Sequence, residues 1–273
     1  MGLTLFCGKP RRGKTSCAIA NILNEDLRYY NDRYYSAKEY IKNLNSRLGI
    51  ELTMPPERHV VSSNIDIYST YPKMSAYKMS GFDFGVPNNY HKTKRLIPFG
   101  VYLFDEAQKY FDSKAEYSLP PWVTQAFELR GHIFLKIILI SQKPKRIHSD
   151  IRAVVDEFIW IEKSVHTYVK GKKKFKSEVY TDEGDLIKTT WYGRRFTEES
   201  QLFSYLDGEK HLGEKYVYEF EGNIKDHYDP YNFAGVMEDY SNDFNYYDDI
   251  TTFGNRPETW NYKKAPKKGE KDE

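Results

Sequence analysis

Residues 8–15 read Gly8-Lys9-Pro10-Arg11-Arg12-Gly13-Lys14-Thr15, which matches the pattern G-x-x-x-x-G-K-[ST] of a phosphate-binding loop. The apolar run at residues 3–7 predicts a short buried strand before the loop, and apolar residues at helical spacing predict a helix over residues 15–27 after it. The glycines allow the backbone N–H groups to face phosphate oxygens, and the helix adds its positive amino-terminal end. This strand–loop–helix context disfavours an accidental Gly-Lys loop and predicts a P-loop NTPase.

The loop residues have expected roles in binding ATP and Mg²⁺. Lys14 is expected to reach the β- and γ-phosphates and so to act in catalysis, and the Thr15 hydroxyl is expected to bind Mg²⁺. The side chains of Arg11 and Arg12 have a simpler alternative, which is to point into solvent. The predicted nucleotide-binding residues are Gly8, Lys9, Pro10, Arg11, Arg12, Gly13, Lys14, Thr15 and Ser16.

Two carboxylates follow a second apolar run, residues 101–104. In P-loop enzymes a carboxylate at the end of a buried strand holds Mg²⁺, so Asp105 is the expected metal residue. Glu106 is the expected base that polarises the attacking water, which favours hydrolysis over phosphoryl transfer to a metabolite. Alone, the pair could equally be an ordinary strand-end cap, but the phosphate-binding loop makes the catalytic interpretation stronger.

Polar residues end a further strand, predicted over residues 134–140. Because the carboxyl ends of parallel strands meet at one edge of a sheet, Gln142 is expected near the γ-phosphate. A plain strand-to-loop transition is the alternative. Arg130 and Arg152 are candidates for an arginine that reaches the γ-phosphate of a neighbouring subunit. A surface salt bridge is as strong an interpretation for each arginine.

The remaining patterns predict an α/β fold with a mostly parallel sheet flanked by helices, a small antiparallel β appendage and an extended carboxyl-terminal tail. We expect three regions: an ATPase domain over 1–163, the β-rich appendage over 164–225, and an acidic Tyr-rich segment with a charged tail over 226–273. Further helices are expected over 29–48, 120–129 and 149–155, further strands over 59–65 and 157–162, and loops with short elements over 69–98.

Composition limits the classes of partner and compartment. The formal net charge of the 273 residues is +2, so the whole-chain charge does not predict a polyanion partner. Cys7 and Cys17 have no metal-binding spacing and are expected to be small buried residues. No run approaches the ~20 apolar residues of a membrane span, and the amino terminus does not resemble a signal peptide. We expect a cytoplasmic protein, in the host cytoplasm if viral, with attachment at the periphery of a membrane or virion as an alternative.

A basic run is the strongest local charge feature. Five lysines lie between Lys170 and Lys176, with Tyr168 and Phe175 beside them. Such a loop is suited to following a nucleic-acid backbone while the aromatic rings stack on bases, and Arg194 and Arg195 would extend the same surface. A solvated hairpin tip is an equally good interpretation.

Over about residues 1–165 the chain resembles the zonula occludens toxin (Zot)-like ATPases, which include assembly proteins of filamentous phages and belong to the FtsK/HerA-like class. The similar segments are the phosphate-binding loop, His59 to Ile65, Leu103 to Phe111, Arg130-Gly131-His132, Ile138 to Pro144 and Ile151-Arg152. The resemblance implies ATP-driven handling of viral DNA, with single-stranded DNA favoured, by a homo-oligomeric ring, with a hexamer favoured.

One departure from the family pattern matters for partners. The familiar assembly proteins have a membrane span after the ATPase domain, whereas this chain shows none. It is therefore expected to act on a viral capsid or to dock on a separate membrane assembly protein. The sequence favours a DNA-moving ATPase; an ATP-dependent assembly switch and a metabolic P-loop kinase remain as alternatives.

Overall fold

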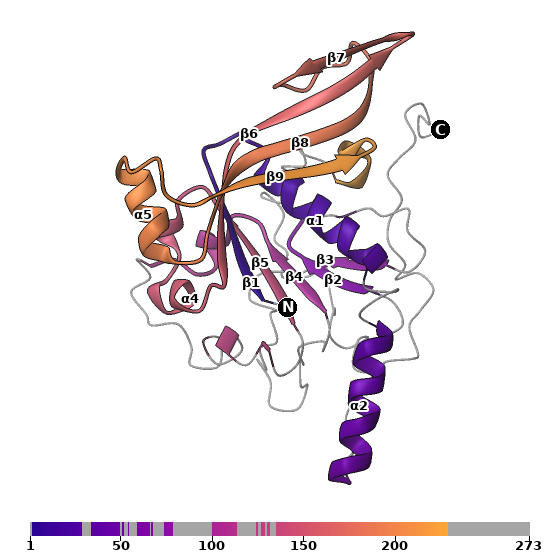
Figure 1. The fold of residues 1–273 in the computed structure, drawn as a ribbon, viewed down its shortest axis with the longest axis vertical. Helices are drawn as coiled ribbons and strands as arrows, with labels where there is room; N and C mark the ends of the chain where they lie inside the picture. The colour runs from indigo at the N-terminus through magenta and orange to yellow at the C-terminus, as the bar shows by residue number, and fades with distance from the viewer. Residues whose placement is uncertain are drawn as a thin grey trace.

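One mixed sheet organises the protein, as the computed structural model shows (Figure 1). The strand order is β3-β2-β4-β5-β1-β6-β8-β9, and β7 pairs with β6 beside this path. The structure describes residues 2–28, 34–49, 51, 54, 59–65, 67, 74–78, 100–113, 124, 127–128, 130–131 and 135–228, and every statement below concerns these residues.

The first half of the sheet is parallel. It consists of β1 (Leu3–Cys7), β2 (His59–Ser63), β3 (Met74–Lys78), β4 (Val101–Phe104), β5 (Lys136–Ser141) and the start of β6 (Glu157–Lys170). All residues of β1 and β4 are buried, because parallel strands are covered on both faces. The predicted α/β class with a mostly parallel sheet is confirmed.

Helices cover the two faces of the sheet, each with its own core, while the helix over Tyr34–Leu48 has a separate small cluster. The helical segments are α1 (Lys14–Arg28), α2 (Tyr34–Leu48), η2 (Ala107–Lys109), η3 (Pro144–Arg146), α4 (Ser149–Ala153), α5 (Glu199–Asp207) and η4 (Ile224–His227). Apolar residues of α1 pack on one face with Phe6 and Ile138, whereas Ile151 of α4 and Leu202 of α5 pack on the other with Leu5. Cys7 and Cys17 are buried free thiols, as expected.

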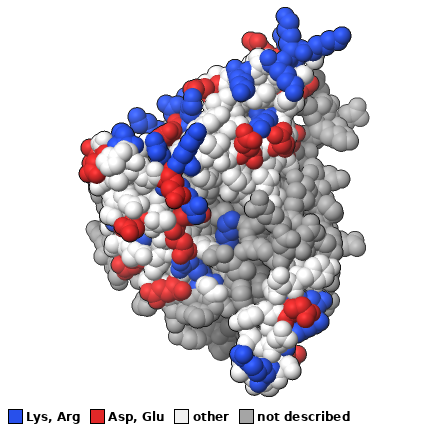
Figure 2. Space-filling view, in the orientation of Figure 1, with Lys and Arg blue, Asp and Glu red and all other residues white. Residues whose placement is uncertain are grey.

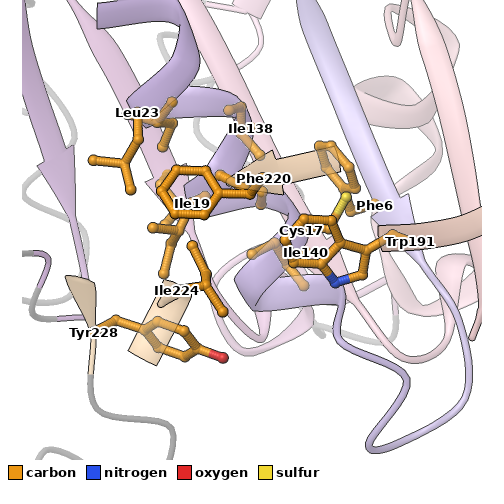
Figure 3. Close-up of a cluster of buried hydrophobic side chains, with 14 of the residues drawn as sticks. Phe6, Cys17, Ile19, Leu23, Ile138, Ile140, Trp191, Phe220, Ile224 and Tyr228 are labelled. Carbon is orange, nitrogen blue, oxygen red and sulfur yellow. The ribbon is translucent and has the colours of Figure 1, made fainter. Parts of the chain in front are cut away.

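The second half of the sheet is antiparallel. It contains the remainder of β6, β7 (Lys173–Ser177), β8 (Asp185–Phe196) and β9 (Glu214–Glu221). The predicted domain boundary between residues 163 and 164 falls inside β6, which continues without a break. Trp191 and Phe220 from this half lie in the same buried cluster as Phe6 and Ile19 (Figure 3). The antiparallel strands therefore help to complete the core around α1.

Several predicted bounds shift. The strand expected over 59–65 ends at Ser63, the helix expected over 149–155 ends at Ala153, and the strand expected over 157–162 extends to Lys170. β3 lies inside the stretch expected to be mainly loop. The start of the helix expected over 29–48, most of the helix expected over 120–129 and the tail beyond Tyr228 lie outside the described residues. Within the described part of the chain, no helix has the length and apolar character to cross a membrane.

A stability prediction follows from the shared core. Phe220 is 3% exposed and packs with α1, whereas Val217 on the same strand is 44% exposed. We expect Phe220→Ala to lower the free energy of unfolding by about 3 kcal/mol and Val217→Ala by less than about 1 kcal/mol. Urea unfolding measures both, with nucleotide-binding affinity measured in parallel. A Phe220→Ala protein as stable as Val217→Ala would contradict the shared core.

Candidate functional site

The candidate site lies where β1, β5 and β4 end. These three strands are parallel neighbours in that order, so the residues that follow them gather at one edge of the sheet. The phosphate-binding loop follows β1, Asp105 and Glu106 follow β4, and Gln142 follows β5. The sequence predicted this meeting of three segments, and their side chains contact one another as described below.

The backbone of the phosphate-binding loop depends on two glycines at close contacts. Gly8 has φ +150°, and a Cβ on it would lie 2.5 Å from the carbonyl oxygen of Ile161 in β6. Gly13 has φ +80°, and a Cβ on it would lie 2.8 Å from the indole nitrogen of Trp191 in β8. Arg11 also has a positive φ, of 59°, without the freedom of glycine. The loop is thus held between the parallel and antiparallel halves of the sheet.

The lysine of the loop is buried and engaged with the loop itself. Lys14 is 7% exposed, and its Nζ donates a hydrogen bond to the backbone oxygen of Lys9 at 3.0 Å. Burial lowers the pKa of Lys14, and the charges of Asp105 and Glu106 oppose that effect. A buried ammonium group with little solvent around it is well suited to bind a phosphate oxygen strongly.

The two predicted magnesium residues lie side by side. The Thr15 hydroxyl is 3.3 Å and 3.2 Å from the two carboxylate oxygens of Asp105. A hydroxyl and a carboxylate are the hard oxygen ligands that Mg²⁺ takes, with water filling its other positions, so the residues fit the ion. Burial, and then the neighbouring Glu106, raise the pKa of Asp105 from 3.8 to about 6. A bound cation would oppose both effects by favouring the carboxylate form.

Asn64 fixes the position of Asp105, a role that the sequence analysis missed. The Asp105 N–H donates to Asn64 Oδ1 at 2.7 Å, and Asn64 Nδ2 donates to the Asp105 carbonyl at 2.9 Å. Asn64 Nδ2 also donates to the Tyr110 hydroxyl at 3.1 Å. Asn64 follows β2, which is the neighbour of β4 in the sheet. A polar residue directly after that strand was the available signal.

Both carboxylate oxygens of Glu106 accept hydrogen bonds from side-chain amides. Gln142 Nε2 donates to Oε1 at 2.6 Å, and Gln108 Nε2 donates to Oε2. Gln108 is held in turn by the Ser141 hydroxyl, which donates to its Oε1 at 2.8 Å. Glu106 has φ +50°, a left-handed conformation that is strained for glutamate and typical of functional sites. The network thus fixes the orientation of the predicted base; Gln108 was a further residue missed from sequence.

Trp191 is the third residue that sequence reasoning missed. Its indole nitrogen donates to the Ser16 hydroxyl at 3.2 Å, and that hydroxyl donates to the Gly13 carbonyl at 3.0 Å. Trp191 is fully buried. It lies 175 residues from the loop in sequence, so no local pattern indicated the contact.

The two arginine candidates lie outside this network. Arg130 bonds to the carbonyl of Val154 and to Asp156, both at 2.8 Å. Asp156 also accepts from the backbone N–H of Leu3, which begins β1, so Arg130 lies at the sheet edge opposite the loop. Arg152 donates to Glu199 of α5 at 2.5 Å and to the carbonyl of Ile147. Each guanidinium is therefore engaged within its own chain, as the salt-bridge interpretation anticipated.

Comparisons with known proteins add a family match. The model of the family described as Zonular occludens toxin (Zot) matches residues 2–209. Among solved structures, the chain is similar to the N-terminal domain of zonular occludens toxin from Neisseria meningitidis, with 15% identity over 83% of this chain and 98% of that one, and a TM-score of 0.46. No curated protein sequence matches the chain.

Two other similar structures have lower TM-scores. The genome packaging NTPase B204 from Sulfolobus turreted icosahedral virus 2, in complex with ATP-gammaS, has 14% identity over 63% of this chain and 77% of that one, with a TM-score of 0.32. The flagellar accessory protein FlaH from Methanocaldococcus jannaschii has 10% identity over 82% of this chain and 87% of that one, with a TM-score of 0.35.

The contact between Gly13 and Trp191 gives a testable prediction. Gly13→Ala combines a left-handed backbone with a clash, so we expect it to lower the free energy of unfolding by about 3 kcal/mol and to abolish nucleotide binding. Gly49→Ala is the matched control, because Gly49 has φ +65° but no atom within 4 Å of the added Cβ. The control should lose only about 1 kcal/mol and keep nucleotide binding. Thermal unfolding and nucleotide titration distinguish the two.

The raised pKa of Asp105 predicts a pH dependence of metal binding. Below about pH 6 a proton competes with Mg²⁺ for this carboxylate, so the affinity for Mg²⁺ with a non-hydrolysable ATP analogue should fall up to about tenfold per pH unit. Calorimetric titration from about pH 8 to about pH 5 measures it. The same measurement on Asp105→Asn gives the pH dependence that comes from protonation of the nucleotide, which is then subtracted. Identical pH profiles for the two proteins would contradict the assignment.

Proposed function

This chain belongs to the zonular occludens toxin (Zot) family, and we propose that it hydrolyses ATP to move viral DNA during packaging, virion assembly or export. The observation that carries the proposal is the meeting of three groups at one sheet edge: the buried Lys14, the Thr15–Asp105 pair and the amide-bound Glu106. Together these groups supply what ATP hydrolysis needs, namely a cation for the phosphates, oxygen ligands for Mg²⁺ and a base for water.

Each residue has a defined role in the proposed reaction. Lys14 exchanges its bond to the Lys9 carbonyl for an oxygen of the β- or γ-phosphate. Thr15 and Asp105 would hold Mg²⁺, which when bound would neutralise the charge that develops on the phosphates. Asn64 keeps Asp105 in place through hydrogen bonds to its backbone.

Gln142 and Glu106 would act in sequence. In this structure the side-chain amide of Gln142 donates a hydrogen bond to one carboxylate oxygen of Glu106. A γ-phosphate offers Gln142 a stronger acceptor, because it is charged. When Gln142 turns to that phosphate, one oxygen of Glu106 becomes available to take a proton from the attacking water. Hydrolysis would then start only after ATP has entered.

We propose that the active form is a homo-oligomeric ring, with a hexamer favoured. Arg130 or Arg152 would act on the γ-phosphate of the neighbouring subunit. Either arginine would first have to leave its own partner, Asp156 or Glu199, so ring assembly would include a rearrangement at those ion pairs.

The proposed partners are DNA, with single-stranded DNA favoured, and a viral capsid or a separate membrane assembly protein. The proposed location is the cytoplasm or the periphery of a membrane or virion.

An ATP-dependent assembly switch is the second candidate. Both oxygens of Glu106 accept amide hydrogens, an arrangement that would keep turnover slow if Gln142 did not move. Such a protein would bind ATP and oligomerise, but DNA would not increase its hydrolysis rate.

Substitution of the predicted base tests the proposed chemistry. Glu106→Gln should keep ATP binding and lower the hydrolysis rate by at least about a hundredfold, because the amide cannot accept the proton. Glu209→Gln, an exposed position, is the control and should hydrolyse ATP at the unaltered rate. Phosphate release and nucleotide binding are the two measurements. Turnover retained by Glu106→Gln would remove Glu106 from the catalytic role.

Measurement of hydrolysis with and without single-stranded DNA, together with the particle mass, tests the motor. DNA-stimulated hydrolysis by a ring-sized particle is the expected result. An oligomer that binds ATP but hardly hydrolyses it would favour the switch instead. A monomer that DNA does not stimulate would favour a metabolic enzyme.

A further inference from the structure

A three-stranded arm extends from the sheet beyond the candidate site. It consists of β6 from Ser164 onward, β7, and the first residues of β8, from Asp185 to Trp191. In Figure 1 the arm projects from the top of the molecule, and Figure 2 shows lysine side chains gathered at its tip. The notable feature of this arm is its charge.

The β6–β7 hairpin concentrates positive charge at its tip, where Asp185 of β8 is the carboxylate paired beside it. Residues 164–177 contain five lysines and no Asp or Glu; the lysines are Lys170, Lys172, Lys173, Lys174 and Lys176, and all are exposed. Lys170 lies directly opposite Lys173 across a two-residue turn, and like charges in that arrangement lower the stability of a hairpin. In the described part of the chain, no ion pair engages Lys170, Lys172, Lys173 or Lys174. A bound polyanion would compensate their repulsion.

The aromatic residues beside the lysines pack inside the arm, Tyr168 fully and Phe175 in part. Tyr168 is 1% exposed, and its ring stacks on Phe175 with centroids 5.3 Å apart. Its hydroxyl accepts the backbone N–H of Thr181 at 3.0 Å. The expectation that both rings stack on bases is therefore wrong for Tyr168, and Phe175 is partly buried against Tyr168 and the core. What remains exposed on the arm suits contacts to phosphates.

Two of the five lysines, with Lys188 of β8, lie on the face of the arm that points away from α1. Lys174 and Lys176 alternate with the inward Phe175, so they point to the face away from α1 and lie about 7 Å apart along β7. Lys188 of β8 occupies the same row as Lys176 and Thr167. Glu219 and Glu221 of β9 are paired with Lys188 at 2.6 Å and 3.1 Å. Asp185 of β8 lies in the row of Lys174, because both residues pair with Val169, and the charge of Lys176 also acts on Glu219. These carboxylates offset only part of the positive charge of the arm, which leaves a surface suited to an external anion.

The composition of the tip favours a nucleic acid over a membrane surface. Segments that bind in the membrane interface insert apolar side chains between lipids. The turn of the arm consists of Gly171 and Lys172, with lysines on both sides, and the nearest large apolar rings face inward. Electrostatic contact along a backbone of phosphates needs no such insertion.

We propose that the arm binds the phosphodiester backbone of a nucleic-acid strand through its lysines, without reading base sequence. The inference rests on the proposed function in that DNA is the substrate that the protein moves. It can be tested without ATP, so its failure is distinguishable from failure of the ATPase assignment. Just before the arm, Ile161 of β6 lies against Gly8 of the phosphate-binding loop, and at its root Trp191 of β8 lies against Gly13, which would couple a load on the arm to the nucleotide site.

The test measures binding of the full-length protein to a fluorescein-labelled single-stranded oligonucleotide by anisotropy, at several salt concentrations. The variant replaces Lys172, Lys174 and Lys176 with Gln. We expect its affinity to fall roughly tenfold or more, and its slope of log affinity against log salt to decrease by about 2, which corresponds to three lost phosphate contacts. The matched control replaces Lys38, Lys42 and Arg47 of α2 with Gln, which removes the same charge elsewhere.

Each outcome decides the proposal. Loss of affinity and of salt slope in the arm variant, with the control variant unaffected and both unfolding at the wild-type temperature, supports it. Equal losses in the two variants, or none, would overturn the arm as the binding surface. Binding of wild type to anionic phospholipid vesicles but not to the oligonucleotide would also overturn it. Unlabelled oligonucleotides of a second base sequence and double-stranded DNA are then added as competitors. Competition by each of them is expected if the arm binds the phosphodiester backbone, and a marked preference for one base sequence would contradict it. ATP hydrolysis by wild type without nucleic acid is measured separately and tests the proposed function alone.

Discussion

The packing of Trp191 against Gly13 is the contact on which the rest of the structure depends. An indole that would lie 2.8 Å from a Cβ on Gly13 leaves no alternative to glycine there, and its N–H fixes the Ser16 hydroxyl at the start of α1. Further along α1, Asn21 and Asn24 donate to the hydroxyls of Tyr216 and Tyr218 in β9. The helix that would receive phosphates at its amino end is thus bonded along its length to the antiparallel half of the sheet. The position of the phosphate-binding loop is therefore a property of the whole sheet.

Charge burial is the second constraint. Lys14, Asp105 and Glu106 gather where solvent is limited, and burial alone would disfavour the charged form of the first two. Neutral amides arrange the cluster: Asn64 holds the backbone of Asp105, while Gln108 and Gln142 hold the carboxylate of Glu106. Amides can donate to a carboxylate without adding a charge of their own. The site can therefore bring two carboxylates and a lysine close together before any ligand neutralises them.

The sequence predicted the parts of this site that local patterns specify. The loop, the strand before it and the Asp-Glu pair each occupy a few consecutive residues, and apolar runs with polar ends revealed them. Trp191 and the partner of Asn64 were missed because they depend on which strands become neighbours, which no short segment specifies. Gln108 lies only two residues from Glu106, and its role was missed because it depends on the left-handed turn that the chain makes after β4. The length of β6 was underestimated for a similar reason. Its apolar run stops near residue 162, but pairing with β7 and β8 continues the strand to Lys170. Tyr168 and Phe175 look exposed in a lysine-rich segment, yet the alternation of a strand turns both rings toward the core.

β6 connects the phosphate-binding loop to the arm, because it passes beside the loop at Ile161 and then extends into the arm. The strand is not uniform: its pairing with β8 shifts between Ile161 and Lys163, so Glu162 is an extra residue at the level of the loop. Such a bulge bends a strand and increases its twist. Here the side chain of Glu162 accepts the Tyr205 hydroxyl of α5 at 2.5 Å, which anchors the bend to the helical layer. On the facing strand Gly193 gives the backbone room, since a Cβ there would lie 2.0 Å from the carbonyl of Trp160. The direction of the arm is therefore determined beside the phosphate-binding loop. About 30 Å of extended strand separates this bend from the tip of the arm. Because the bend lies beside the phosphate-binding loop and the lysines lie far along the strand, a small change in this bend would move the lysines much farther than it moves the loop.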